Sequence, residues 1–200
     1  MTDAPQPAAT RLQLRMRRPH LDHLPPVTVP AGYTLRTYRP GDERAWGQIM
    51  ESPGGIGQDW TEAKVLERLI QQPPFEPAGL FFVTSDTEGG RPVASACAWR
   101  GGLDRDYVPI LHMVAAMEAH RGRGLGRLVC LAVLHYCRER GDPFIELGTD
   151  DFRLAAIKSY LGMGFVPVYR EDAGRHDDHR LRWSAVFQTL LAPLAARPAP

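Results

Sequence analysis

The sequence predicts an α/β protein in which helices flank a mixed sheet, and three neighbouring features support this fold class. Residues 110–117 form a mostly apolar run without a helix breaker, as in a buried strand. A glycine-rich turn at 120–126 leads into an amphipathic helix, and residues 143–149 are strand-like again. A strand, a crossover helix and a second strand form a unit whose two strands run parallel.

The crossover helix is predicted from the spacing of its apolar residues. They recur at intervals of three and four residues, which places them on one helical face. These residues are Leu125, Leu128, Val129, Ala132, Val133, Tyr136 and Cys137. Gly141 suits the left-handed position that ends a helix, and Arg138 and Arg140 suit the negative end of its dipole.

The residues at the start of the chain predict its first strands. Residues 1–10 have the composition of a flexible tail. Alternating apolar residues at Leu12, Leu14 and Met16 predict a short edge strand. Residues 33–38 are strand-like by residue type and by alternation.

Two helices are predicted after the second of these strands. Asp42 is placed to cap a helix through 44–50. Thr61 is placed to cap another, whose apolar side includes Val65 and Leu69. A pair of prolines ends this second helix.

Two antiparallel strands are predicted next, at 79–84 and 92–99. Ala94, Ala96 and Ala98 share one face of the second strand, since side chains alternate along a strand. Such small side chains leave room for a ligand or a helix to pack closely, and a helix is the simpler interpretation.

The end of the chain predicts two helices with a strand between them. Thr149 or Asp150 is placed to cap a helix at 151–161. Residues 165–169 predict a strand at a sheet edge, because the proline within it cannot donate a ladder hydrogen bond. Residues 182–191 have a helical pattern of apolar residues.

Length and composition favour one domain. The chain has 200 residues and 44% hydrophobic content, enough for one sizeable core, and we assign 11–195 to a single domain that ends in a frayed 196–200. A formal net charge of +1 argues against a nucleic-acid partner, and the lack of a long apolar run argues against a membrane. An odd count of three cysteines, without a secretory signal, indicates a reducing cytoplasm.

One histidine pair has spacing that metal sites also use. His176 and His179 are three residues apart, but their charged neighbours include no clear further ligands. We interpret this stretch as a solvated loop and predict no metal.

The turn before the crossover helix has the features of a phosphate-binding site. Gly122, Gly124 and Gly126 occupy alternate positions, where the missing side chains let an anion approach. The first amide groups of the following helix have no partner within it and lie at the positive end of its dipole. Arginines at the same end of the helix add positive charge: Arg121, Arg123 and Arg127.

The motif in this turn is not that of a nucleotide-binding protein. The P-loop needs Lys-Ser or Lys-Thr after Gly126, and the glycine spacing differs from the dinucleotide-binding pattern, which disfavours a nucleoside-triphosphate enzyme. The pattern R-x-x-G-x-G from Arg121 to Gly126 instead resembles the diphosphate-binding motif of the GCN5-related N-acetyltransferase (GNAT) superfamily, whose ligand is acetyl-coenzyme A (acetyl-CoA). The resemblance covers roughly 33–169 and is strongest at 111–127.

This resemblance implies a fold and a cofactor site. The family's sheet is mixed and mostly antiparallel, and its central parallel strands splay apart to hold the pantetheine arm. Backbone groups on the strand are expected to pair with that arm at Val114, Ala115 and Ala116. The diphosphate is expected at Arg121, Gly122, Arg123, Gly124, Leu125, Gly126 and Arg127. The last segment departs from the family, because a helix is predicted where the family has its seventh strand.

The resemblance also implies catalytic residues. Tyr160, in the pattern Y-x-x-x-G-F, is the expected proton donor to the leaving thiolate. His112 is the candidate base, acting directly or through a water, because histidine titrates near neutral pH. Many members have a glutamate where this chain has Ile110, which leaves that role vacant. Glu51 and Asp106 are weaker candidates, as acidic walls for a cationic acceptor.

One further side chain is expected to contact the coenzyme. Arg153 lies seven residues before Tyr160, so the two share a helical face. Many relatives have asparagine there, and an arginine is expected to reach a phosphate of CoA instead.

The predicted function is transfer of an acetyl group from acetyl-CoA to a primary amine by direct attack. The acceptor is a small molecule or a peptide, and a homodimer is compatible with the sequence. The alternative is a catalytically inactive CoA-binding regulatory module. The enzyme and the inactive module are distinguished by whether the side chains of His112 and Tyr160 face the position of the coenzyme's sulfur atom.

Overall fold

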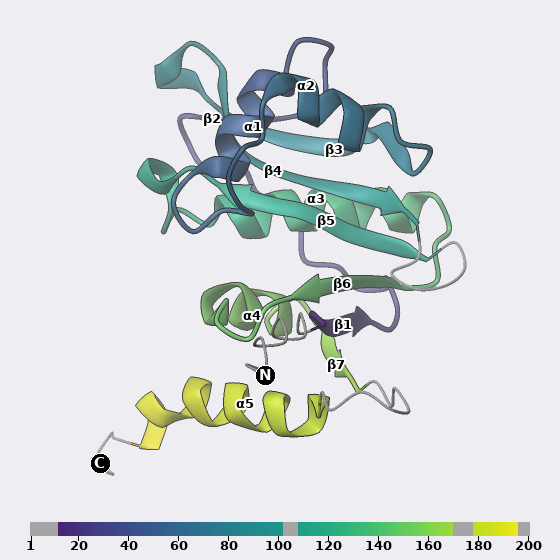
Figure 1. Cartoon of the computed structure of the whole chain (residues 1–200), viewed down its shortest axis with the longest axis vertical. Coiled ribbons are helices and arrows are strands. Elements are labelled where there is room, and N and C mark those ends of the chain that lie inside the picture. Colours follow the sequence, from purple (N-terminus) through teal and green to yellow (C-terminus); the bar gives the residue numbers. More distant parts are fainter. Residues whose placement is uncertain (1–11, 102–107, 170–177, 196–200) are drawn as a thin grey trace, which may run out of the picture.

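The computed structural model describes residues 12–101, 108–169 and 178–195. The strands are β1 (Leu14–Arg18), β2 (Tyr33–Thr37), β3 (Phe75–Ser85), β4 (Arg91–Arg100), β5 (Pro109–Ala116), β6 (Ile145–Thr149) and β7 (Val166–Val168). They form one sheet in the order β2-β3-β4-β5-β6-β1-β7 (Figure 1). All neighbours are antiparallel except β5 and β6, which confirms the predicted mixed, mostly antiparallel sheet.

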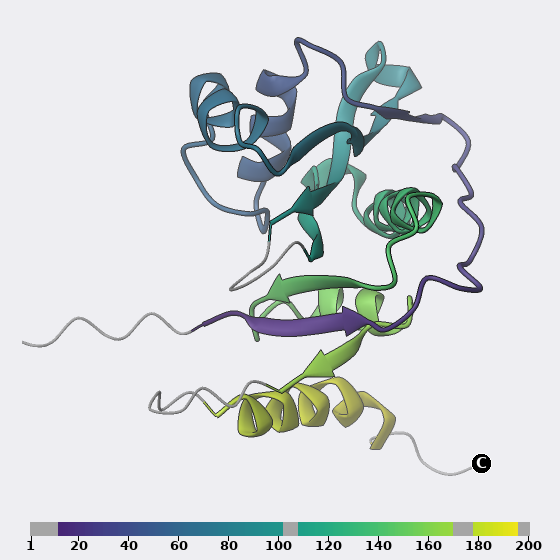
Figure 2. The ribbon, with the colours of Figure 1, turned by 90° about the vertical axis from the view of Figure 1, so that its right-hand side faces the viewer.

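Helices cover both faces of this sheet (Figure 2). They are α1 (Glu43–Glu51), α2 (Glu62–Val65), α3 (Leu125–Glu139), α4 (Leu154–Leu161) and α5 (His179–Ala195), with short helical segments η1 (Leu66–Ile70), η2 (Asp86–Glu88) and η3 (Glu118–His120). One apolar cluster lies between α1, α2 and the sheet, and a larger one joins α3, α4 and α5 to the other face.

The alanines of β4 show why α3 packs closely on the sheet. Ala94, Ala96 and Ala98 are buried in the same cluster as the apolar face of α3. Val129 and Val133, from the predicted helical stripe, are fully buried there. The small side chains on β4 therefore make room for a helix, which was the simpler interpretation of the sequence.

The parallel strands β5 and β6 separate soon after they meet. Ile110 of β5 pairs with Glu146 of β6, and this is the pairing that joins the two strands. β5 then continues to Ala116 and β6 to Thr149. The splay that the family resemblance implies is thus present, and it opens at the carboxyl ends of the strands.

The first strand lies inside the sheet, so the prediction of an edge strand was wrong. β1 is antiparallel to β6 on one side and to β7 on the other, with Leu14 opposite Thr149 and Met16 opposite Pro167. The alternation of apolar and polar residues in β1 indicates which side chains are buried. It does not indicate which strands pair with β1 in the sheet. The edge strand on this side is β7, as the proline predicted. The last segment is the helix α5, as predicted.

Helix ends follow the predicted chemistry at some positions and not at others. Gly141 has φ +79° and donates its N–H to the carbonyl of Arg138 at 2.9 Å, and Thr61 accepts from the amide of Lys64 at 3.4 Å. Asp42 occupies the N-cap position of α1 but makes no capping bond. Its carboxylate instead accepts from Arg36 at 2.7 and 2.8 Å, a stronger partner than a backbone amide.

Helix α4 begins later than predicted. Its first residue is Leu154, and the N-cap position is held by Arg153, so neither Thr149 nor Asp150 caps it. The carboxylate of Asp150 is engaged by a side chain, Arg153, at 2.9 Å. The residues between β6 and α4 are therefore a loop at the open end of the splayed strands.

Helix α5 starts at His179, which is only 3% exposed, so the prediction of a solvated loop was wrong for this residue. His176 lies outside the described residues. Within the described ranges no three His, Cys, Asp or Glu side chains group together as metal ligands would. Among the same residues, no helix has both the length and the apolar character to cross a membrane.

Candidate active site

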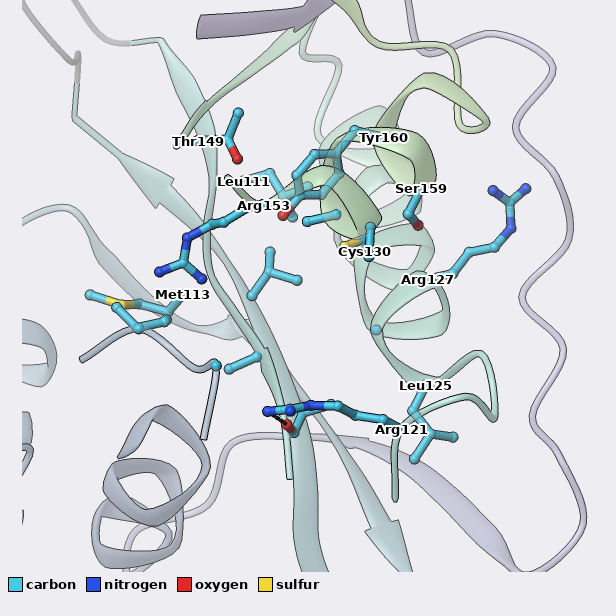
Figure 3. A pocket seen from close by; sticks show the side chains of 18 of the residues that line it. Leu111, Met113, Arg121, Leu125, Arg127, Cys130, Thr149, Arg153, Ser159 and Tyr160 are labelled. Carbon is cyan, nitrogen blue, oxygen red and sulfur yellow. Dashed lines mark hydrogen bonds between the residues drawn. The ribbon is translucent and has the colours of Figure 1, made fainter. Parts of the chain in front are cut away.

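A pocket of about 510 Å³ lies where β5 and β6 separate (Figure 3). Its walls come from β5, from the turn between β5 and α3, from the end of β6, and from α4. All the predicted cofactor-binding and catalytic residues line it except Arg123. Residues that are far apart in the sequence therefore meet at one cavity, as ligand sites in open α/β sheets do.

One end of the pocket has the features of an anion site built from backbone. Gly122 and Gly124 have φ of +75° and +78°, a conformation that glycine adopts without strain. A Cβ added at either position, or at Gly126, would meet nothing within 4 Å, so the approach is open. The first helical bond of α3 runs from Leu128 N to Gly124 O at 3.0 Å. The amides at 122–127 therefore remain available to an anion at the positive helix end.

Two arginines, from the turn and from the first turn of α3, also line the pocket. Arg121 donates to the carbonyls of Pro53 and Ala116, the latter at 3.4 Å. Arg127 donates to the carbonyl of Gly162 at 3.2 Å. Arg121 carries its charge beside the glycine turn, which suits a diphosphate. The guanidinium of Arg127 lies instead at the C-terminal end of α4 (Figure 3).

Arg123 points elsewhere. Its guanidinium donates to the phenolic oxygen of Tyr33 at 2.5 Å and to the carbonyl of Ala119 at 3.4 Å. It also lies 6.0 Å from the centre of the Tyr33 ring. The structure therefore gives Arg123 contacts that support the turn from outside the pocket.

The wall formed by β5 contains a bulge. His112 pairs with Cys97 and Ala115 with Ser95, so Met113 and Val114 together face one residue of β4. Met113 has φ +50°, which is rare for a residue with a side chain, and its carbonyl accepts from the Ser95 hydroxyl at 3.2 Å. The bulge turns the backbone of β5 at the level where the strand lines the pocket.

Tyr160 reaches the pocket from α4 and is 7% exposed. Burial raises the pKa of its phenol well above the usual value, and the nearby Arg153 opposes this only in part. The hydroxyl is therefore protonated at neutral pH and able to donate a proton. Cys130 lines the same side of the pocket, and Figure 3 shows its sulfur beside Tyr160.

His112 lines the pocket from β5. Burial lowers the pKa of its imidazole to about 4, so the ring is neutral at pH 7. Its ring centre lies 5.3 Å from that of Trp99. Its strand partner Cys97 belongs to the apolar cluster under α1, whereas Tyr160 belongs to the cluster with α3. His112 and Tyr160 therefore come to the pocket from opposite faces of the sheet.

Arg153 crosses the pocket from α4 toward the loop after α1. Its Nε donates to Asp150 at 2.9 Å, and its Nη1 donates to the carbonyl of Gly55 at 2.9 Å. Figure 3 shows it beside Tyr160 and Thr149, with Arg121 and Leu125 at the other end of the pocket. The expected link from Arg153 to a phosphate stays a prediction.

Glu51, one of the two weaker acidic candidates, is not among the described residues that line the pocket. The carboxylate of Glu51 accepts from the backbone amide of Trp60 at 2.7 Å, which gives it a structural role in the loop after α1. Asp106 lies outside the described residues.

Sequence reasoning missed several residues that line the pocket. They are Gln13, Gly54, Ile56, Leu111, Met113, His120, Cys130, Gly148, Thr149, Asp150, Ala155, Ala156 and Ser159. Thr149 and Asp150 follow a strand of a parallel pair, and ligands bind at such carboxyl ends, so this signal was available. No sequence signal pointed to Gln13, because its position in the pocket depends on where β1 lies in the sheet.

The fold and the pocket define a class of α/β proteins with a cavity beside a helix N-terminus, between splayed parallel strands. The chain belongs to the acetyltransferase (GNAT) family, whose model matches residues 46–165. A crystal structure of a GCN5-related N-acetyltransferase from Sphaerobacter thermophilus superposes with a TM-score of 0.61 at 24% identity, over 79% of this chain and 50% of that one. That likeness shows the fold.

Curated relatives have the same domain within longer chains. Mycothiol acetyltransferase of Thermomonospora curvata is 37% identical over 165 residues, which are 80% of this chain and 53% of that protein. Mycothiol acetyltransferase of Rhodococcus erythropolis is 34% identical over 167 residues, 78% of this chain and 54% of that protein. The chain spans about half the length of these relatives.

Proposed function

We propose that this chain is an N-acetyltransferase that moves an acetyl group from acetyl-CoA to a primary amine of a small molecule or peptide. One observation carries the proposal: a single pocket joins the anion-binding turn to Tyr160 and His112. Along β5, His112 lies four residues before Ala116, a span of roughly 13 Å at the rise of an extended strand. An extended thioester arm fits this separation.

In this proposal the coenzyme follows the open edge of β5. The amides of the glycine turn hold the diphosphate, and Arg121 balances its charge. The backbone of Val114, Ala115 and Ala116 pairs with the pantetheine arm as a neighbouring strand would. The thioester then lies between His112 on one face of the sheet and Tyr160 on the other.

The proposed reaction is direct attack by the neutral amine on the thioester carbonyl. A carbon–nitrogen bond forms as the carbon–sulfur bond breaks, and the leaving thiolate takes the proton of Tyr160. The new ammonium gives up a proton toward His112. An imidazole with a pKa of about 4 is a weak base, so we favour a water held by His112 that relays this proton to solvent.

The cysteine in the pocket supports direct attack over an acyl-cysteine intermediate. Burial raises the pKa of the Cys130 thiol to about 12. A thiol with that pKa is protonated at neutral pH, and the thiolate is the nucleophilic form. The Cys130 thiol therefore does not compete with the amine acceptor for attack on the thioester.

The proposal is tested by release of free CoA thiol from acetyl-CoA with a panel of primary amines. Thiol release that depends on both enzyme and amine, with an acetylated product of matching mass, supports acetyl transfer. Binding of acetyl-CoA without thiol release from any amine supports the alternative, a CoA-binding module without catalysis. ATP that binds more tightly than acetyl-CoA contradicts both.

A further inference from the structure

We propose that the acceptor end of the pocket selects amines with polar, hydrogen-bonding substituents and that Gln13 determines this specificity. The proposal rests on the acetyl transfer proposed above, and it names the class of acceptor. It follows from the place of β1 in the sheet, from the face on which His112 lies, and from a chain of polar contacts beside the thioester position.

The position of β1 brings Gln13 to the pocket. Gln13 directly precedes β1, whose first residue Leu14 lies opposite Thr149 of β6. A Cβ added to Gly148 would lie 2.6 Å from Oε1 of Gln13. The glutamine side chain therefore lies directly over the glycine of β6, in space that a side chain at 148 would otherwise take. Gln13 itself is exposed, so its amide is accessible to a substrate.

Gln13 lies on the same face of the sheet as the candidate base. Ile110 pairs with Glu146, and side chains alternate along each strand, so His112 and Gly148 project to the same face. The side chain of Gln13 covers Gly148 on this face. Leu147 projects to the opposite face and belongs to the cluster that contains Tyr160. An amine that approaches from the His112 side therefore meets Gln13.

A chain of polar contacts continues from Gln13 along this side of the pocket. Nε2 of Gln13 donates to one carboxylate oxygen of Asp150 at 3.3 Å. The other oxygen accepts from Nε of Arg153 at 2.9 Å, and Nη1 of Arg153 donates to Gly55 at 2.9 Å. All of these side chains line the pocket. Under this proposal Arg153 serves the acceptor side, in place of the CoA phosphate contact expected from the sequence. The acceptor then meets an amide, a carboxylate and a guanidinium beside the thioester.

The charges in this chain favour neutral polar substituents. The carboxylate of Asp150 already forms an ion pair with Arg153, so it does not need a cationic group of the substrate to balance its charge. Hydroxyl and amide groups can use the remaining donor and acceptor positions of Gln13 and Asp150. An apolar substituent at the same place would displace water from these groups without replacing its hydrogen bonds.

A matched pair of acceptors tests this proposal. L-Threoninamide and L-valinamide have the same shape, and a hydroxyl in the first replaces a methyl in the second. We expect kcat/KM at saturating acetyl-CoA to be about fivefold higher for threoninamide, the ratio that one hydrogen bond supports. In Gln13→Leu this ratio should fall toward one, with the KM for acetyl-CoA unchanged. Gln71→Leu, an exposed glutamine outside the pocket, should keep the wild-type ratio.

Two results would overturn the proposal. One is equal use of both amides by the wild-type protein, and the other is a preference that Gln13→Leu leaves unchanged. Circular dichroism of Gln13→Leu serves as the folding control, and we expect the wild-type spectrum because the substituted side chain is exposed. Failure of the proposed function itself is a different result, because acetyl-CoA then binds and no amine releases thiol.

Discussion

The phenolic oxygen of Tyr33 lies 3.0 Å from Nδ1 of His120. The other ring nitrogen of His120 lies 2.7 Å from the carboxylate of Glu88, and Arg123 donates to the same phenolic oxygen. His120 is 6% exposed and is the first residue of the glycine-rich turn at 120–126. These contacts attach the anion-binding turn to β2 and to η2, and they give Arg123 a supporting role.

Removing the Tyr33 hydroxyl should weaken coenzyme binding more than turnover. Tyr33→Phe leaves His120 and Arg123 without their shared partner, so the turn is held less firmly. We expect the KM for acetyl-CoA to rise about fivefold while kcat changes less than twofold, as for loss of one or two hydrogen bonds. Steady-state kinetics at saturating amine measures this. Tyr169→Phe, at an exposed position outside the pocket, should change neither value.

A charge placed on the glycine turn should block coenzyme binding. Gly124→Glu puts a carboxylate where the diphosphate is proposed to lie, and calorimetry should show acetyl-CoA affinity reduced at least about 100-fold. Gly141→Glu is the matched control, because Gly141 has φ +79°, has open space around its Cβ position, and lies at the other end of α3. Both variants bear the same backbone strain, so loss of binding in both would point to strain and not to the site.

Removing the hydroxyl of Tyr160 should affect the chemical step. Tyr160→Phe keeps the ring that packs against Phe165 and loses the proton donor. We expect kcat to fall by about 100-fold or more, with a much smaller change in the KM for acetyl-CoA. Unchanged turnover in this variant would remove Tyr160 from the mechanism.

The pH dependence of the reaction should reflect the low pKa of His112. A base with a pKa of about 4 stays unprotonated from pH 7 down to pH 5. We therefore expect kcat/KM, expressed per concentration of neutral amine, to be flat between pH 7 and pH 5. A decrease centred near pH 6.5 would mean that His112 titrates as an exposed histidine does.

The lowered pKa of His112 also predicts that the folded protein loses stability in acid. His112 binds a proton near pH 6.5 when the chain is unfolded and only near pH 4 when it is folded, so stability falls as pH decreases through this window. The loss from this residue is about 2 kcal/mol between pH 7.5 and pH 5. Urea denaturation should show that the free energy of unfolding decreases less between pH 7.5 and pH 5 in His112→Gln than in the wild-type protein. An equal decrease in both proteins would contradict the lowered pKa of His112.

The sequence was most informative where local chemistry determines structure. Apolar spacing located α3, and three alternate glycines located the turn that opens it, because both signals lie within a few residues of their effect. The predicted residues between Val114 and Arg127, except Arg123, line one pocket for the same reason, since the strand, turn and helix that hold them are contiguous in the chain. Arg153 and Tyr160 reach the same pocket from a separate element, α4, and the family resemblance, not local chemistry, predicted their place.

The sequence was least informative where structure depends on distant partners. Alternation predicted β1 but not its place between β6 and β7, so Gln13 could not be assigned to the pocket. Asp150 was expected to cap α4, and its ion pair with Arg153 took precedence. The bulge at Met113 likewise follows from pairing with β4, which no local signal in β5 reports.

A crystal structure with CoA bound tests the central claim most directly. The account predicts the diphosphate within hydrogen-bonding distance of the backbone amides at 122–127, and the sulfur between His112 and Tyr160. A coenzyme bound elsewhere, or with its sulfur away from both side chains, would contradict it.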